Sequence, residues 1–227
     1  MNLEQEFFLN GFIEYKLKSS NNLDKLLNDL NKINIGKTNP GFEMKQKYKN
    51  TLDLSPSVYN YSTSFFDILK ENFLPKLLNQ LTQKNNFCYH VQLRKTLPSS
   101  SSYMTNHRDS YIRNKQIIGN IPPPIKIIFY PRFNNQKENK LSVISGSHIR
   151  FFHNYYLDRF INSFGKKRII KSSNSKIIIF NTMLYHSIFP EKNKNGSLRL
   201  IYSFGDEYII KNYSHHQHLI DYYKNML

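Results

Sequence analysis

The chain carries a His-x-Asp pair near its middle and a further histidine much later in the sequence. The pair is His107 and Asp109, and the later histidine is His186, which Arg199 follows. Side chains two positions apart on an extended strand point to the same side, because side-chain direction alternates along a strand. Folding that brings His186 to this pair would place two imidazoles and one carboxylate around a single metal ion.

This ligand set predicts an iron site. Two His and one carboxylate on one face leave coordination positions open, as in non-haem Fe(II) oxygenases. Each residue also has a purely structural interpretation. His107 would then be an exposed strand residue, Asp109 a turn cap, and His186 a buried histidine bonded to backbone. The order of the surrounding elements favours the metal interpretation.

Composition limits the remaining possibilities. A chain of 227 residues fits one domain with a sizeable core. The single cysteine, Cys88, excludes an internal disulfide and argues against a cysteine-based metal site. No apolar run is long enough for a transmembrane helix. The acidic, polar start at Met1–Glu6 argues against a secretory signal, so we expect a cytoplasmic protein.

The net charge of +16 raises the question of a nucleic-acid partner. The lysines are scattered along the chain, and arginine, the better phosphate ligand, is scarce. A base-composition bias toward Lys, Asn and Ile explains the charge more simply. Nucleic acid is therefore a disfavoured partner, and a small molecule is the preferred substrate.

The first third of the chain is predicted to be mainly helical. Apolar residues recur at three- and four-residue steps within Asn21–Ile35, as on one face of an amphipathic helix. A second helical region runs from about Ser64 to Gln83, and Pro75 is expected to kink or split it. Both apolar faces are interpreted as packing surfaces.

From Phe87 onward the pattern changes to short strands. The predicted strands are Phe87–Leu97, Tyr103–Asp109, Ile125–Tyr130, Leu141–Ile144, Arg168–Lys171, Lys176–Phe180, Tyr185–Phe189 and Leu198–Phe204. The aromatic-rich segment Phe151–Phe164 lies between them as a lid or an inserted helix. Helices followed by about eight strands favour an α+β domain with a sandwich or barrel core.

Three segments resemble one enzyme family. Lys126–Tyr130, Leu141–His148 and Lys176–Arg199 are similar to the Fe(II)- and 2-oxoglutarate-dependent dioxygenases, in particular their phytanoyl-CoA dioxygenase-like branch. That branch has a His-x-Asp strand, a Gly-Ser-His turn, a distal His and then an Arg. The turn here is Gly146–His148, and the resemblance covers roughly Phe87 to Gly205.

The resemblance implies a fold, a cofactor and residue roles. The fold would be a double-stranded β-helix (jelly roll, cupin-like), buttressed by N-terminal helices. Within a single domain of 227 residues, 1–86 would be mainly helical support, 87–206 the β-helix core and 207–227 a C-terminal tail. His107, Asp109 and His186 would bind Fe(II), with 2-oxoglutarate and O2 in the open positions. Arg199 would pair with the distal carboxylate of 2-oxoglutarate, since a guanidinium matches a carboxylate with two hydrogen bonds.

Some positions depart from related patterns. Some relatives have a Ser two residues after the Arg, and that position is Ile201 in this chain. Nucleic-acid demethylases of the superfamily have a second Arg six residues after the first, and that position is Gly205 here. Met104 replaces a Tyr of some prolyl hydroxylases, whereas Asp109 argues against a halogenase. The candidates for further contacts to 2-oxoglutarate are Gln92, Tyr103, Lys126 and Ser203.

The expected function is therefore hydroxylation of a small-molecule or acyl substrate, with decarboxylation of 2-oxoglutarate to succinate. Two alternatives stay open. One is the same chemistry on a protein or nucleic acid, and the other is a non-catalytic jelly-roll binding module.

Overall fold

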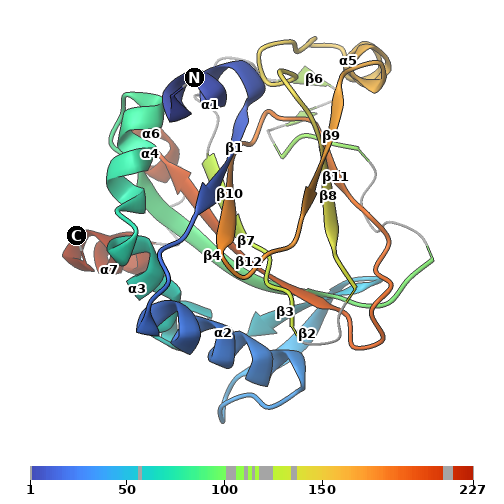
Figure 1. Cartoon of the computed structure of the whole chain (residues 1–227). Helices are drawn as coiled ribbons and strands as arrows, with labels where there is room; N and C mark the ends of the chain where they lie inside the picture. The colour runs from blue at the N-terminus through green and yellow to red at the C-terminus, as the bar shows by residue number, and fades with distance from the viewer. Residues whose placement is uncertain are drawn as a thin grey trace.

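The computed structural model describes residues 2–55, 58–100, 106–109, 112–113, 116–117, 125–133, 137–211 and 217–226. Within these ranges a large antiparallel sheet lies between a layer of helices and a smaller antiparallel sheet (Figure 1). The α+β class predicted from the sequence is confirmed.

The large sheet has seven strands, and every neighbouring pair in it is antiparallel. Its strands, in spatial order, are β1 (Phe12–Lys16), β10 (Lys176–Asn181), β7 (Ile125–Phe129), β12 (Ser197–Gly205), β4 (Phe87–Thr96), β3 (Thr51–Ser55) and β2 (Glu43–Tyr48). Strands β7, β12 and β4, which hold the candidates Lys126, Arg199, Ser203 and Gln92, therefore lie side by side at its centre.

The small sheet has three strands and faces the large one across the interior. Its order is β11 (His186–Ile188), β8 (Lys140–Ile144) and β9 (Lys167–Lys171). A separate two-stranded ribbon is formed by β5 (Ile112–Arg113) and β6 (Gln116–Ile117).

Most helices cover the outer face of the large sheet, on the left and along the bottom in Figure 1. They are α1 (Leu3–Asn10), α2 (Asn21–Asn34), α3 (Ser64–Glu71), α4 (Leu74–Thr82), α6 (Glu207–Lys211) and α7 (Gln217–Met226), with a short 3-10 turn at Val58–Asn60. The exception is α5 (Tyr155–Ser163), which lies at the opposite upper corner beside the small sheet.

The predicted helical region from Ser64 to Gln83 is split into α3 and α4, as Pro75 indicated. Phe73 adopts a left-handed backbone with φ of 53°, and Pro75 falls in the first turn of α4. Proline is well placed there because the first amides of a helix lack intrahelical acceptors. The break redirects the chain so that both halves pack on the sheet.

Alternation along the strands separates two apolar cores. On β7, Ile127 and Phe129 join the core beneath the helices, whereas Ile128 joins the core between the two sheets. Lys126 shares the parity of Ile128 and therefore faces the space between the sheets. The same parity places Arg199 and Ser203 of β12 with Ile201 on that inner face.

The structure also departs from the predicted elements. The first 86 residues contribute three strands, β1 to β3, beside their helices. For the predicted strand Tyr103–Asp109, residues 103–105 lie outside the described ranges, and His107 forms an isolated bridge rather than part of a strand. The remaining seven predicted strands have counterparts in β4 and in β7 to β12.

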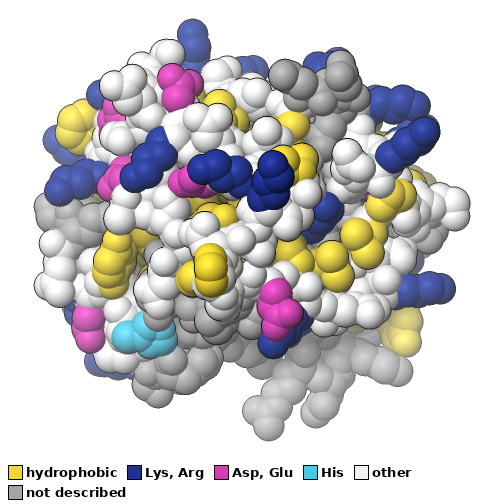
Figure 2. All heavy atoms as spheres, turned by 90° about the horizontal axis from the view of Figure 1, so that it is seen from below, with side chains coloured by type: hydrophobic (Ala, Val, Ile, Leu, Met, Phe, Trp, Pro, Cys, Tyr) yellow, Lys and Arg dark blue, Asp and Glu magenta, His cyan; other side chains and the backbone are white. Residues whose placement is uncertain are grey.

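Lysine and arginine side chains are dispersed over the face seen in Figure 2 and are interleaved there with Asp and Glu. No helix in the described part of the chain is both long and apolar enough to span a bilayer.

Candidate metal centre

The backbone holds His107 and His186 opposite each other. The amide of His107 donates to the carbonyl of His186, and the amide of His186 donates to the carbonyl of His107, both at 2.9 Å. This bridge sets the first residue of β11 beside the His-x-Asp segment. The two imidazole centroids are consequently 4.3 Å apart.

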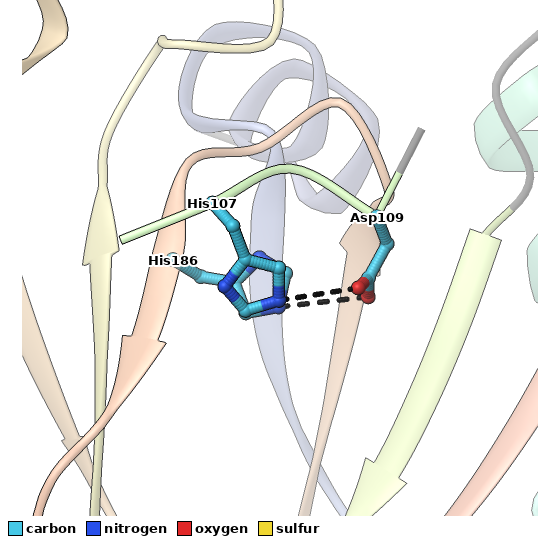
Figure 3. A group of neighbouring side chains, drawn as sticks. All are labelled: His107, Asp109 and His186. Carbon is cyan, nitrogen blue, oxygen red and sulfur yellow. Dashed lines mark ion pairs between the residues drawn. The ribbon is translucent and has the colours of Figure 1, made fainter. Parts of the chain in front are cut away.

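Asp109 completes the group predicted from the sequence. Its amide donates to the carbonyl of Thr182 at 3.0 Å, which fixes the segment against the turn before β11. One carboxylate oxygen lies 3.3 Å from Nε2 of His107, and the other lies 3.5 Å from Nε2 of His186 (Figure 3). One nitrogen or oxygen atom from each residue lies within 4.8 Å of the others, which is close enough for all three to hold one metal ion.

The hydrogen bonding of His186 leaves one ring nitrogen available as a ligand. Its Nδ1 lies 3.0 Å from the carbonyl oxygen of Leu184. A carbonyl only accepts, so we assign the ring proton to Nδ1, and Nε2 then directs its lone pair at Asp109. Burial lowers the pKa of His186 to about 4, although the charge of Asp109 opposes this shift. The imidazole is therefore neutral near pH 7.

Asp109 is anionic because the ammonium of Lys126, together with the neighbouring histidines, outweighs the effect of burial on its pKa. Burial by itself would raise the pKa of this carboxyl, but Lys126 foremost, with His186 and His107, holds it well below the ordinary value. The ammonium of Lys126 lies 2.7 Å from Oδ2 of Asp109. A carboxylate facing the lone pair of a neutral imidazole is a repulsive arrangement that a cation between them would relieve. These donors therefore fit a divalent metal of the Fe(II) type.

The side chain of Arg108 supports the ligand segment from behind. It is 1% exposed and pairs with the Asp158 carboxylate of α5 through Nε and Nη2, both at 2.8 Å. Its Nη1 donates to the carbonyl of Ser147 at 2.8 Å and also to the carbonyl of Met183. Arg108 thus ties together the ligand segment, the Gly-Ser-His turn, the turn before β11 and α5.

Arg199 lies deeper between the sheets and outside the three-residue group. It is 2% exposed, and its Nη2 donates to Oγ1 of Thr96 at 2.8 Å. Ser203 of the same strand pairs in register with Lys126, which contacts Asp109. Arg199 is four residues from Ser203, or about 13 Å along a strand. Arg199 is therefore on the inner face, displaced along the strand from the three-residue group.

Sequence comparisons identify no relative of this chain. Protein-family models give no match, and neither do curated proteins.

Solved structures, in contrast, give clear matches in fold. HygX from Streptomyces hygroscopicus, crystallised with nickel, 2-oxoglutarate and hygromycin B, has a TM-score of 0.64 at 13% identity, covering 91% of this chain and 88% of that one. The epimerase SnoN, in complex with Fe3+, alpha ketoglutarate and nogalamycin RO, has a TM-score of 0.67 at 8% identity, covering 90% and 82%. EvdMO1 has a TM-score of 0.64 at 12% identity. The match covers 90% of this chain but only 49% of the longer EvdMO1 chain.

The chain has the jelly-roll fold of the non-haem 2-oxoglutarate-dependent enzymes. The double-stranded β-helix core expected from the resemblance is thereby confirmed. In this jelly roll, the His-x-Asp segment and the start of β11 meet at one end of the space between the sheets.

The other candidates are distributed differently. Lys126 contacts Asp109, whereas the Gln92 amide donates to Asp53 at 2.7 Å. Ser203 is buried beside Lys126, and Tyr103 lies outside the described residues. His148 of the Gly-Ser-His turn does not join the metal group, because its Nε2 lies 2.9 Å from the carbonyl oxygen of Phe8. The sequence suggested that Arg108 attracts an anionic substrate or lies in solvent, whereas it is buried and paired with Asp158.

Proposed function

We propose that the chain is an Fe(II)- and 2-oxoglutarate-dependent oxygenase. The observation that carries the proposal is the convergence of His107, Asp109 and His186 within 4.8 Å, in the jelly roll shared with HygX and SnoN. An anionic carboxylate and a neutral imidazole are ready to bind a divalent ion without losing a proton. When bound, iron would couple the reduction of O2 to the oxidative decarboxylation of 2-oxoglutarate, which yields succinate.

The protein's own residues would place the cosubstrate. The Arg199 guanidinium is buried and immobilised against Thr96 and the ring of Tyr130, 5.9 Å away. A buried guanidinium is suited to a carboxylate, because both groups are planar and charge-assisted hydrogen bonds strengthen where water is excluded. The neighbouring cation Arg94 is already bound through two hydrogen bonds by Asp53, at 2.8 and 3.0 Å. We therefore assign the distal carboxylate of 2-oxoglutarate to Arg199.

The proposed substrate is a small or acyl molecule that is hydroxylated. HygX was crystallised with the small molecule hygromycin B, which supports this substrate class. SnoN is an epimerase, so the same fold also hosts a different outcome of the reaction. Hydroxylation is proposed rather than halogenation because position 109 is Asp, whereas an Ala or Gly there would have suggested a halogenase.

Anaerobic titration of the apoprotein with Fe(II) and then 2-oxoglutarate tests the proposal. We expect a visible charge-transfer band in the wild type, which His107→Ala abolishes and Arg199→Ala weakens. His153→Ala is the matched histidine control, because His153 is exposed and outside the metal group, and it should retain the band.

A missing band together with weak Fe(II) binding would refute the oxygenase proposal and favour a jelly-roll binding module. A band that survives in His107→Ala would refute the ligand assignment. Once the band is established, substrate-dependent succinate release separates candidate small molecules from protein or nucleic-acid substrates.

A further inference from the structure

Helix α5 buries polar residues and exposes apolar ones, the reverse of an ordinary surface helix. Its fully buried positions are Asp158 and Asn162, one turn apart. Asp158 binds Arg108 and also accepts a hydrogen bond from the backbone amide of Phe152, before the helix, at 3.1 Å. The helix is therefore anchored to the molecule by an ion pair and hydrogen bonds rather than by its hydrophobic side chains.

The outward face of α5 is a continuous apolar stripe. Phe160 is 63% exposed, and Phe164, just after the helix, is 76% exposed. Tyr156 and Leu157 precede them by one turn, and Ile161 lies between them, so the exposed positions recur at the spacing of one helix face. Exposed aromatic groups gathered in this way mark an interaction site rather than scattered surface residues.

The chain before and after the stripe is basic. Between His148 and Lys171 the sole acidic residue is Asp158, which is buried against Arg108. The basic residues of this segment are Arg150, Arg159, Lys166, Lys167, Arg168 and Lys171. Within this segment the exposed charge is thus of one sign, and its last cation, Lys171, pairs with Glu138 from outside the segment at 3.0 Å.

We propose that α5 docks the protein onto the surface of an anionic phospholipid bilayer. Aromatic and aliphatic side chains would enter the boundary between headgroups and acyl chains, and the Lys and Arg residues would meet the lipid phosphates. A second copy of the chain is a poorer occupant, because it would bring an identical set of positive charges to the contact. Single-stranded nucleic acid would use the aromatic rings but would gain nothing from Leu157 and Ile161.

Docking through α5 would also orient the metal centre. Arg108 lies between His107 and Asp109 and is fixed to α5 by Asp158. The candidate site would therefore be held close to the bilayer, a position suited to an acyl substrate. This consequence rests on the proposed oxygenase function, whereas the docking itself does not.

The chain lacks tryptophan, so one introduced Trp is a reporter without background. In the full-length Phe160→Trp variant, we expect a blue shift of emission with phosphatidylcholine vesicles that contain phosphatidylserine, and a much smaller shift with pure phosphatidylcholine. Phe73→Trp is the matched control, since Phe73 is 64% exposed among the helices on the other side of the molecule. Its emission should not change.

Co-sedimentation with the same vesicles separates the apolar and ionic contributions. Phe160→Ser with Phe164→Ser should abolish binding to anionic vesicles. Arg159→Gln with Lys166→Gln should weaken it by about fivefold for each cation removed. The control pair, Lys47→Gln with Lys49→Gln, lies on and beside β2 and should bind like wild type.

Several outcomes would overturn the proposal. One is binding that the α5 variants leave unchanged, which would assign it to the net charge as a whole. Another is a dimer that the Phe160 and Phe164 substitutions dissociate, which would identify a second copy as the occupant. A blue shift with a single-stranded oligonucleotide but not with vesicles would assign the face to nucleic acid.

Discussion

At the scale of single residues, the His-x-Asp segment depends on the side chain between His107 and Asp109, the two proposed ligands. The His-x-Asp spacing predicted that the side chains of His107 and Asp109 point to the same side of the backbone. In the structure, Nε2 of His107 lies 3.3 Å from Oδ1 of Asp109. Alternation also sends Arg108 to the opposite side, but its partner could not be predicted. Asp158 lies 50 positions later and meets Arg108 only through the packing of α5.

Replacing Arg108 by Lys should weaken metal binding. Lysine keeps the charge but cannot span Asp158, Ser147 and Met183 at once, so the ligand segment loses its support. Outer-shell substitutions of this kind reduce metal affinity by about 10- to 100-fold. Calorimetric titration with Co(II), together with the visible spectrum of bound Co(II), measures both the affinity and the ligand geometry.

Arg94→Lys is the matched control for this experiment. This substitution also breaks an Arg–Asp pair held by two hydrogen bonds, the one between Arg94 and Asp53. Arg94 lies on β4 and is outside the metal group. The substitution should lower thermal stability without changing Co(II) affinity. Equal losses of Co(II) affinity in Arg108→Lys and Arg94→Lys would show that Arg108 acts through general stability alone.

Lys126→Met should have the opposite effect on metal affinity. The Lys126 ammonium competes for Oδ2 of Asp109 at 2.7 Å and repels an incoming dication. Its removal should tighten Ni(II) binding by about tenfold, because one nearby positive charge at a partly screened site would no longer repel the metal ion. Lys176→Met removes an exposed lysine paired with Glu14 and should leave the affinity unchanged. Weaker binding in Lys126→Met would mean that Lys126 orients the carboxylate instead.

At the scale of elements, the sequence predicted the helices and strands whose apolar residues form a clear pattern. The buried strand β10 and the amphipathic helix α2 were both identified from such patterns. Strand β2 was not, because it is an edge strand with nearly every residue exposed, and no alternation marks it. Helix α7 was missed because Leu219, Ile220 and Tyr223 give only a short apolar pattern in a polar tail.

The end of α4 provides a test of backbone strain. Gln83 follows the helix with φ of 55°, a conformation in which glycine is favoured. Gln83→Gly should therefore raise the free energy of unfolding by about 0.5–1 kcal/mol. Gln80→Gly, at an exposed position inside the same helix, should lower it by about 1 kcal/mol. Urea unfolding measures both, and a loss of stability in both variants would contradict the assignment of strain to Gln83.

At the scale of the whole molecule, the jelly-roll core was predicted from the order of motifs rather than from composition. The +16 charge suggested nucleic acid, but charge alone does not reveal where it gathers. The basic residues near α5 can be seen in the sequence, since Arg150 and Arg168 lie on either side of that helix along the chain. The sequence pattern could not show that α5 turns its polar face inward.

Cys88 reports on the integrity of the core where the large sheet meets α7. Its thiol is 0% exposed on β4, and burial raises its pKa, so the native protein should react very slowly with a thiol reagent. Tyr223 of α7 is equally buried and packs near Phe204, with ring centroids 5.7 Å apart. Tyr223→Ala should leave a cavity beside this strand at a cost of about 3–5 kcal/mol. Opening would then be more frequent, and labelling of Cys88 should accelerate by at least about a hundredfold.

Tyr208→Ala is the control for this effect, because Tyr208 lies on the neighbouring helix α6 and is 56% exposed. Its loss should leave the labelling rate close to that of wild type. Rapid labelling of the wild type would mean that the sheet opens locally at β4 without unfolding. Slow labelling in Tyr223→Ala despite a lowered urea midpoint would mean that Cys88 is protected by the strands alone, with α7 an independent cooperative unit. Acceleration only in Tyr223→Ala would show that the C-terminal helix and the jelly-roll core open together.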